Sequence, residues 1–343
     1  MEYKNKGLTG LVNLGNTCFM NSAIQCLSNT IKLTDYFNTK EFANDINKNY
    51  KHIQLAYQWH RLLKGIWESN CIVSPTSFHK TIRELSEEMG YINFTGFNQN
   101  DTQEFLILMI DTLHESLSRE VKITISGKVK NKQDKMALNA MKNWKTHFKS
   151  SYSKIIELFY GQLVSSIYTM DDELLSESFD PICMFDLPIP QKEAAPITLY
   201  DCFDLYTDGE VLDGDNQYKN DKTGEHIDAK KKIQIWTFPE ILIISLKRFS
   251  VNGFRLNKRN DIVDIPIDNL NLGKYCVGYT KNKSKYELYG VCNHSGGLGG
   301  GHYFAFCKNP NGNWYSYNDN FVKKIESESV ITNMAYVLFY KRK

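Results

Sequence analysis

The stretch Gly10–Leu27 reads GLVNLGNTCFMNSAIQCL, which is the pattern of a loop that runs into an amphipathic helix. Turn and cap residues end at Thr17, and apolar residues then return every three or four positions. We therefore predict a helix with Asn16 or Thr17 as its N-cap and with Cys18 in its first turn. Unpaired N–H groups at a helix start favour an anion, so we expect the pKa of the Cys18 thiol to be lowered. A lone cysteine is more often a buried structural thiol, so the rest of the chain decides its role.

Two stretches near the C-terminus contain the groups that a reactive thiol needs. The segment Gly296–Phe306 reads GGLGGGHYFAF, and Trp314–Asp319 reads WYSYND. His302 begins an alternating, strand-like run after the glycines, and the second stretch ends as a strand does. If the two strands pair, Asn318 or Asp319 can orient the imidazole of His302, which in turn can activate a thiol. The residues themselves leave the choice between these two side chains open.

Four stretches together resemble the ubiquitin-specific proteases. Gly10–Leu27 resembles the cysteine box of that family, and Gly296–Phe306 resembles its histidine box. Gln99–Leu106, which reads QNDTQEFL, resembles the start of a family helix. Phe238–Phe249, which reads FPEILIISLKRF, resembles its central palm strand. The order and separation of the four stretches also fit, and they extend over nearly the whole chain.

The resemblance implies an α+β fold of the papain-like cysteine protease type, with a helical thumb, a β-rich palm and β-stranded fingers. We expect a single catalytic domain, with the thumb at about 7–155, the fingers at about 156–235 and the palm at about 236–343. Hydrophobic residues make up 42% of the chain, which is ample for one large core. The pattern turns from helical to β-rich near residue 156. The strands expected in the palm sheet are 232–236, 240–249, 263–267, 274–280, 285–293, 302–308, 314–318 and 334–341.

The fingers of this family often bind a structural zinc through two Cys-x-x-Cys pairs. Alignment of the flanking residues puts Thr169 and Asp172 at the first pair, and the second falls in 220–225, which contains no cysteine. A zinc site of ordinary form needs four well-placed Cys or His ligands. We therefore expect fingers held by strand pairing, with no metal and no cofactor.

The resemblance also assigns roles at the site. Cys18 would attack the carbonyl carbon of the terminal glycine of ubiquitin, and His302 would raise its thiolate fraction and protonate the leaving amine. Asn318 matches the third position of the triad, and the neighbouring Asp319 remains the alternative. Asn13 matches the side-chain donor of the oxyanion hole.

Other residues are implied in binding the ubiquitin tail. A tail that ends in two glycines must pass a narrow channel, and a glycine-rich loop leaves room for it. Asp101 is also explained as an acid in the first turn of a helix, and we keep both explanations. The residues expected to bind the tail are Gln99, Asp101, Gly300, Gly301 and Tyr303.

Composition narrows the partners and the compartment. The 41 Lys and Arg residues nearly balance the 39 Asp and Glu residues, so the totals indicate neither a nucleic acid nor a membrane partner. The basic stretch 119–154 is interpreted as a solvated loop and helix face. The eight cysteines are scattered, which fits a reducing compartment better than a disulfide framework. We expect an intracellular, cytoplasmic or nuclear monomer without a signal peptide or a membrane span.

The activity expected from these features is thiol-dependent hydrolysis of the bond after the C-terminal glycine of ubiquitin, with ubiquitinated proteins as substrates. Two alternatives stay open. In the first, the chain is a protease for another modifier with a Gly-Gly tail. In the second, it is an inactive scaffold that binds ubiquitin. The presence of Cys18, His302 and Asn318 argues against the scaffold.

Overall fold

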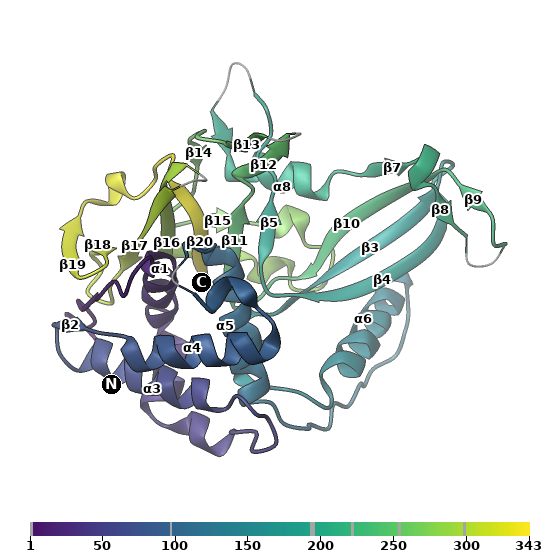
Figure 1. The fold of residues 1–343 in the computed structure, drawn as a ribbon. Coiled ribbons are helices and arrows are strands. Elements are labelled where there is room, and N and C mark those ends of the chain that lie inside the picture. The colour runs from purple at the N-terminus through teal and green to yellow at the C-terminus, as the bar shows by residue number, and fades with distance from the viewer. Residues whose placement is uncertain (1–2, 97, 193–195, 221–222, 253–254, 298–299) are drawn as a thin grey trace.

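The computed structural model describes residues 3–96, 98–192, 196–220, 223–252, 255–297 and 300–343. Its N-terminal part is helical, and these helices occupy the lower half of the molecule in Figure 1. In the third helix the apolar residues recur every three or four positions and are all buried, from Leu55 to Trp67, so this helix packs by its apolar face. The helices are α1 (Cys18–Ser28), α2 (Ile31–Asn38), α3 (Gln54–Glu68), α4 (Thr76–Met89), α5 (Thr102–Ser116), α6 (Lys132–Phe148) and α7 (Lys154–Phe159), with short 3₁₀ turns at Glu41–Asn44 and Ile92–Phe94.

A mixed sheet forms the palm. Its described strands are ordered β19-β18-β17-β16-β20-β11-β5, and β15 pairs with β16 at one end. The long strand β16 lies between β17, which follows it in the chain, and β20, near the C-terminus (Figure 1). The strands are β5 (Phe185–Leu187), β11 (Ile241–Leu246), β15 (Leu270–Asn271), β16 (Lys285–Gly297), β17 (Gly300–Lys308), β18 (Trp314–Asn318), β19 (Phe321–Ile325) and β20 (Ala335–Arg342).

The fingers are a second sheet, with the order β4-β3-β10-β7 among the described strands. It extends to one side in Figure 1, with α6 packed beneath it. Ala137 and Ala140 of α6 share a small core with Val164, Phe179 and Trp236 of the sheet. The strands are β3 (Gly161–Thr169), β4 (Leu174–Ile182), β7 (Glu210–Leu212) and β10 (Ala229–Thr237).

Three strands predicted for the palm differ from the structure. Residues 232–236 belong to β10, which pairs with β3 in the fingers sheet. Pro239, which has no N–H, lies between β10 and β11. The segment 263–267 is shorter than predicted, and β14 (Val263–Asp264) pairs with β6 (Ile197–Thr198) outside the palm sheet.

The prediction of a strand at 274–280 is wrong. This segment begins with a 3₁₀ turn at Gly273–Tyr275, and a single bridge joins Cys276 to Ile235. A Cβ atom at Gly278 would lie 2.2 Å from the backbone oxygen of Trp236, so the chain approaches the end of β10 too closely for an ordinary strand pair. The strand β19, by contrast, was not predicted.

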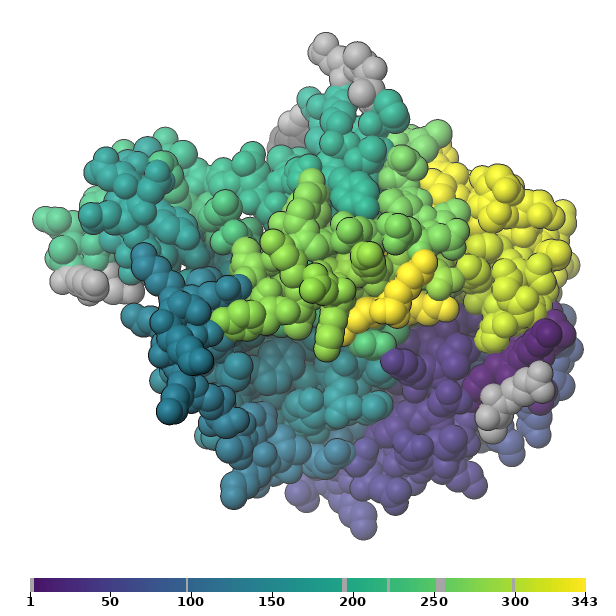
Figure 2. All heavy atoms as spheres, turned by 180° about the vertical axis from the view of Figure 1, so that it is seen from behind, coloured from purple at the N-terminus to yellow at the C-terminus, as the bar shows by residue number. Residues whose placement is uncertain are grey.

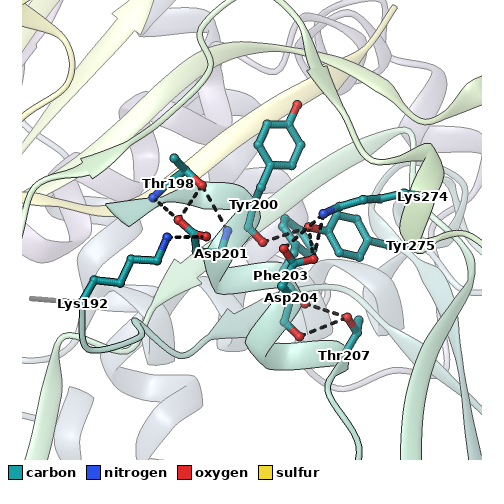
Figure 3. Close-up of polar contacts among 9 residues, drawn as sticks. All are labelled: Lys192, Thr198, Tyr200, Asp201, Phe203, Asp204, Thr207, Lys274 and Tyr275. Carbon is teal, nitrogen blue, oxygen red and sulfur yellow. Dashed lines mark hydrogen bonds and ion pairs between the residues drawn. The ribbon is translucent and has the colours of Figure 1, made fainter. Parts of the chain in front are cut away.

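A short helix, α8 (Leu199–Thr207), follows β6. Thr198 and Asp201 form a capping box at its start, and Lys192 pairs with the same carboxylate at 2.7 Å (Figure 3). One turn later Asp204 accepts from Lys274 and from the hydroxyl of Tyr275, which fixes α8 beside the 3₁₀ turn (Figure 3). The remaining described strands are β1 (Gly10–Leu11), β2 (Ile72–Val73), β8 (Tyr218–Lys219), β9 (His226–Ile227), β12 (Phe249–Asn252) and β13 (Arg255–Lys258), with 3₁₀ turns at Gly214–Asn216, Lys281–Lys283 and Ser327–Ser329.

Helix α1 joins the N-terminal helical part to the palm sheet. Every residue of this helix is buried, and its core residues join those of β16, β17 and β20 in one cluster. Seen from behind, the purple N-terminal segment lies directly beside the yellow C-terminal strands (Figure 2). The hydroxyl of Tyr317 donates to the Gly7 carbonyl at 3.1 Å, which ties the two ends together. No helix within the described ranges is long and apolar enough to cross a membrane.

Candidate active site

The predicted helix with Cys18 in its first turn is confirmed: α1 begins at Cys18, and Thr17 is the N-cap of the two candidates. The hydroxyl of Thr17 does not cap the helix but accepts from the Leu14 N–H at 2.9 Å. The side-chain oxygen of Asn13 accepts from the N–H groups of Gly15, at 3.0 Å, and Thr17, at 3.1 Å. The loop before Cys18 is therefore fixed by hydrogen bonds of its own.

The Cys18 thiol is only 3% exposed, and burial raises its pKa. A backbone hydrogen bond from Tyr303 opposes this shift, and the negative charge of Asp319 adds to it. The expectation of a lowered pKa is therefore wrong for this state of the protein. The effect of the helix start on the pKa of Cys18 is outweighed by the loss of water around the sulfur.

His302 and Asn318 meet across the pair of strands β17 and β18. The ring Nε2 of His302 lies 2.6 Å from Oδ1 of Asn318. The acceptor is an amide oxygen, so Nε2 is the protonated nitrogen and Nδ1 is the basic one. The structure shows no hydrogen bond between the described side chains of His302 and Cys18. The backbone of the neighbouring Tyr303 does form a hydrogen bond with Cys18. The thiol and the imidazole thus lie on the neighbouring elements α1 and β17, without a hydrogen bond between them.

Asp319 does not contact His302 but binds two amides of the N-terminal part. Its Oδ2 accepts from Nδ2 of Asn13 at 3.0 Å, and its Oδ1 accepts from Nδ2 of Asn21 at 2.8 Å. The Leu11 N–H donates to its carbonyl at 2.8 Å. Sequence reasoning missed Asn21, although a polar residue three positions after Cys18 on a buried helix was a usable signal.

A cleft of about 360 Å³ lies between the start of α5 and the palm sheet. Of the residues expected to bind the tail, Gln99, Asp101 and Tyr303 line it directly. Gly301 is joined to Gln99 by two hydrogen bonds, at 2.8 and 3.0 Å, and Gly300 precedes it on β17. The other lining residues are Asn93, Asn100, Glu104, Phe249, His294 and Gly297. Leu298 and Gly299 of the glycine run lie outside the described residues.

Asp101 has the structural role expected of it. It is the N-cap of α5 and accepts from the Gln103 N–H at 2.6 Å. The Tyr336 hydroxyl donates to its other oxygen at 2.8 Å. Burial raises the pKa of this carboxyl, and these hydrogen bonds oppose the shift. With Glu104 in the same cleft, the wall facing the palm carries two acids that favour a cationic ligand segment.

His294 is a cleft residue that sequence reasoning missed. It is 5% exposed, and its Nδ1 is buried without a hydrogen-bond partner among the described residues. Burial lowers the pKa of His294 to about 4, and the charge of Lys258 contributes. Its ring lies 4.5 Å from that of Tyr303, so a neutral polar ring forms part of the cleft wall.

The residues expected at the zinc positions of the fingers bind other groups of the protein. Thr169 accepts from the N–H groups of the β3–β4 turn, and Asp172 pairs with Lys230 at 2.8 Å. Residues 221–222 of the second position lie outside the described part. Within that part, no group of three or more His, Cys, Asp and Glu side chains is arranged to hold a metal ion. These side chains therefore do not fit a zinc site.

Comparisons with known proteins agree with this geometry. Residues 9–340 match the model of the ubiquitin carboxyl-terminal hydrolase family. The chain is 38% identical over 344 residues to human ubiquitin carboxyl-terminal hydrolase 2, covering 98% of this chain and 55% of that protein. It is 32% identical over 356 residues to human ubiquitin carboxyl-terminal hydrolase 21, covering 98% of this chain and 61% of that protein. The chain thus spans little more than half the length of these relatives.

Among solved structures, the SAGA Ubp8/Sgf11/Sus1/Sgf73 DUB module bound to ubiquitin aldehyde contains a chain with a TM-score of 0.75 and 26% identity. The alignment covers 100% of this chain and 71% of that one. The α+β fold expected from the resemblance is confirmed by this likeness. With a family model that matches from residue 9 to residue 340, the chain belongs to the ubiquitin carboxyl-terminal hydrolase family.

Proposed function

We propose that this chain is a cysteine-type deubiquitinase, which hydrolyses the isopeptide or peptide bond after the C-terminal glycine of ubiquitin. The single observation that carries the proposal is the 2.6 Å contact between His302 of β17 and Asn318 of β18, next to Tyr303, whose backbone contacts Cys18. The names of the relatives, ubiquitin carboxyl-terminal hydrolases 2 and 21, support the same reaction. The substrates are ubiquitinated proteins.

The chemistry begins from a neutral thiol. Because burial raises the pKa of Cys18, the proton must pass to Nδ1 of His302 as the substrate carbonyl arrives. The sulfur then attacks the carbonyl carbon, and the imidazolium gives its proton to the leaving amine as the C–N bond breaks. Water, deprotonated by the same ring, attacks the carbonyl carbon of the resulting thioester. The C–S bond then breaks, the ring returns the proton to the sulfur, and ubiquitin leaves with a free carboxylate. Asn318 holds the ring in the required tautomer throughout.

Asn13 supplies the donor for the negative charge that develops on the carbonyl oxygen. Its Nδ2 carries two hydrogens, and only one is used by Asp319. The other is available to an oxyanion next to Cys18, and such a donor contributes about 3 kcal/mol in the transition state. Asp319 acts through Asn13 as a positioning residue.

The ubiquitin tail occupies the cleft between α5 and the palm. Gln99, Gly300 and Gly301 border its path, and Tyr303 lines its wall. Asp101 faces the tail, while it also caps α5. The reciprocal bonds between Gln99 and Gly301 must open or shift for an extended backbone to enter between them.

Reactive-tail probes made from ubiquitin and from other Gly-Gly modifiers test this proposal. We expect the ubiquitin probe to label Cys18, and Cys18→Ala to abolish both labelling and reporter hydrolysis. Cys71→Ala is the matched control, because Cys71 is an exposed free thiol and should not matter. Labelling by another modifier in place of ubiquitin would indicate the protease for that modifier. Binding of ubiquitin without labelling would indicate the inactive scaffold.

The chain is further proposed to act as a monomer in a reducing compartment of the cytoplasm or nucleus, with no nucleic acid or membrane partner. All eight cysteines are free, including the buried Cys26, whose sulfur lies 3.5 Å from that of Cys292. Such close thiols persist unpaired where disulfides are kept reduced. Sedimentation of the purified chain over a range of concentrations measures the oligomeric state.

A further inference from the structure

The hairpin of β18 and β19 places one exposed aromatic residue beside the catalytic pair. Asn318 ends β18, Phe321 begins β19, and the two are direct partners in the strand register. Side chains of such partners stand on the same face of a sheet, with Cβ atoms about 5 Å apart. Phe321 therefore stands next to the side chain that holds His302.

The side chain of Phe321 is largely exposed to solvent. Its exposed fraction is 73%, which is the largest among the aromatic residues in the described part of the chain. A single exposed Phe needs no explanation by itself. Its position does, because the turn before it is fixed: Asp319 has a φ of 49° and is held by Asn13 and Asn21. The backbone that carries Phe321 is thus held beside Asn318.

The strand order places this ring on the side opposite to the tail cleft. The cleft residue His294 lies on β16, on one side of the strand that carries His302. Phe321 lies on β19, two strands away on the other side. A tail that enters over β16 with its carbonyl at Cys18 therefore directs its leaving amine toward β18 and β19.

We propose that Phe321 is a specificity-determining residue that contacts the acceptor chain, packing on the aliphatic stem of the lysine whose amine leaves. This inference rests on the proposed deubiquitinase function and extends it to the leaving side. A lysine stem of four methylene groups is apolar up to its amine and packs well on an aromatic face. The ring therefore improves binding of lysine-linked conjugates and contributes nothing to small leaving groups.

Two substrates that share ubiquitin and differ in the leaving group test this. One is ubiquitin C-terminal ethyl ester, and the other is ubiquitin joined through an isopeptide bond to the lysine of a short peptide. For Phe321→Ser we expect kcat/KM on the lysine conjugate to fall about five- to ten-fold, mainly through KM. Hydrolysis of the ester should stay within about two-fold of the parent chain, because no stem is present to lose.

Two further variants complete the experiment. Phe321→Tyr keeps the ring and should restore the lysine conjugate. Ile262→Ser removes another exposed apolar side chain, 64% exposed between β13 and β14, and should change neither substrate. An equal loss on both substrates, or no loss on the conjugate, overturns the role of Phe321 while the ester activity leaves the proposed function intact. A parent chain that hydrolyses neither substrate contradicts the proposed function, and this inference falls with it.

Discussion

Asn13 and Asp319, which are 306 positions apart in the chain, are joined by a hydrogen bond of 3.0 Å from Nδ2 to Oδ2. The same carboxylate accepts from Asn21 at 2.8 Å, so it fixes both amides around the start of α1. Asn318, one residue earlier, faces His302 instead. Two consecutive residues thus contact two different parts of the site, the side chain of Asn13, which we propose as the oxyanion donor, and the imidazole of His302.

This division predicts a coupling between Asn13 and Asp319. If Asp319 acts through Asn13, then Asp319→Ala should lower kcat strongly in the parent chain and much less in Asn13→Ala. We expect an interaction energy of about 1–2 kcal/mol in the double-mutant cycle on reporter hydrolysis.

Asn318→Ala provides the comparison for this cycle, because its partner is the imidazole. Its loss should be nearly the same in the parent and in Asn13→Ala. Equal losses from Asp319→Ala in both backgrounds would instead assign Asp319 a direct role at the reacting atoms.

The local parts of this site could be predicted from the sequence, and the long-range parts could not. Capping residues and an apolar period placed the start of α1 at Cys18 correctly. The neighbours of Asp319 were not accessible, because they depend on how β18 and β19 lie against α1. The direction of the pKa shift of Cys18 was predicted wrongly for the same reason, because the burial that raises this pKa comes from the fold and not from the helix itself.

The close approach at Gly301 leads to a stability prediction. A Cβ atom at this position would lie 2.1 Å from Nε2 of His294 and 2.9 Å from the Ser295 carbonyl oxygen. Gly301→Ala should therefore cost about 1–3 kcal/mol and lower the melting temperature by several degrees. The matched control is Gly300→Ala, where the added atom meets nothing within 4 Å. Equal melting temperatures for the two variants would contradict the crowding.

The sheets show a similar limit of prediction. Alternating patterns identified β16, β17, β18 and β20 with small errors at their ends. A period of two does not say which sheet a strand joins, so β10 was assigned to the palm although it pairs with β3. Only long-range pairing decides such cases.

Buried histidines make stability depend on pH in the acidic range. His114 is 7% exposed, and burial lowers its pKa to about 4. In the unfolded chain this group has a pKa of about 6.5, so below that pH the unfolded state binds the extra proton. The free energy of unfolding should therefore fall as the pH is lowered from about 6.5 toward 4, by about 1 kcal/mol for this residue between pH 7.5 and 5.5.

Urea unfolding of His114→Asn at these two pH values measures this contribution. The variant should lose about 1 kcal/mol of the pH dependence of the parent chain. His226→Asn is the control, since His226 is exposed on β9 and its replacement should leave the dependence unchanged. The same dependence in His114→Asn as in the parent would show that another group is responsible.

The last prediction is that activity and stability do not depend on zinc. Asp172 of the fingers is ion-paired with Lys230, and Thr169 accepts hydrogen bonds within its own turn, so neither is free to bind a metal. Strand pairing between β3, β4 and β10 holds this region, where a zinc tetrahedron would otherwise be needed. Prolonged treatment with a chelator should change neither the melting temperature nor reporter hydrolysis, and elemental analysis should find no stoichiometric zinc. One tightly held equivalent, lost together with the fold, would contradict this, because a structural zinc contributes its binding free energy directly to folding.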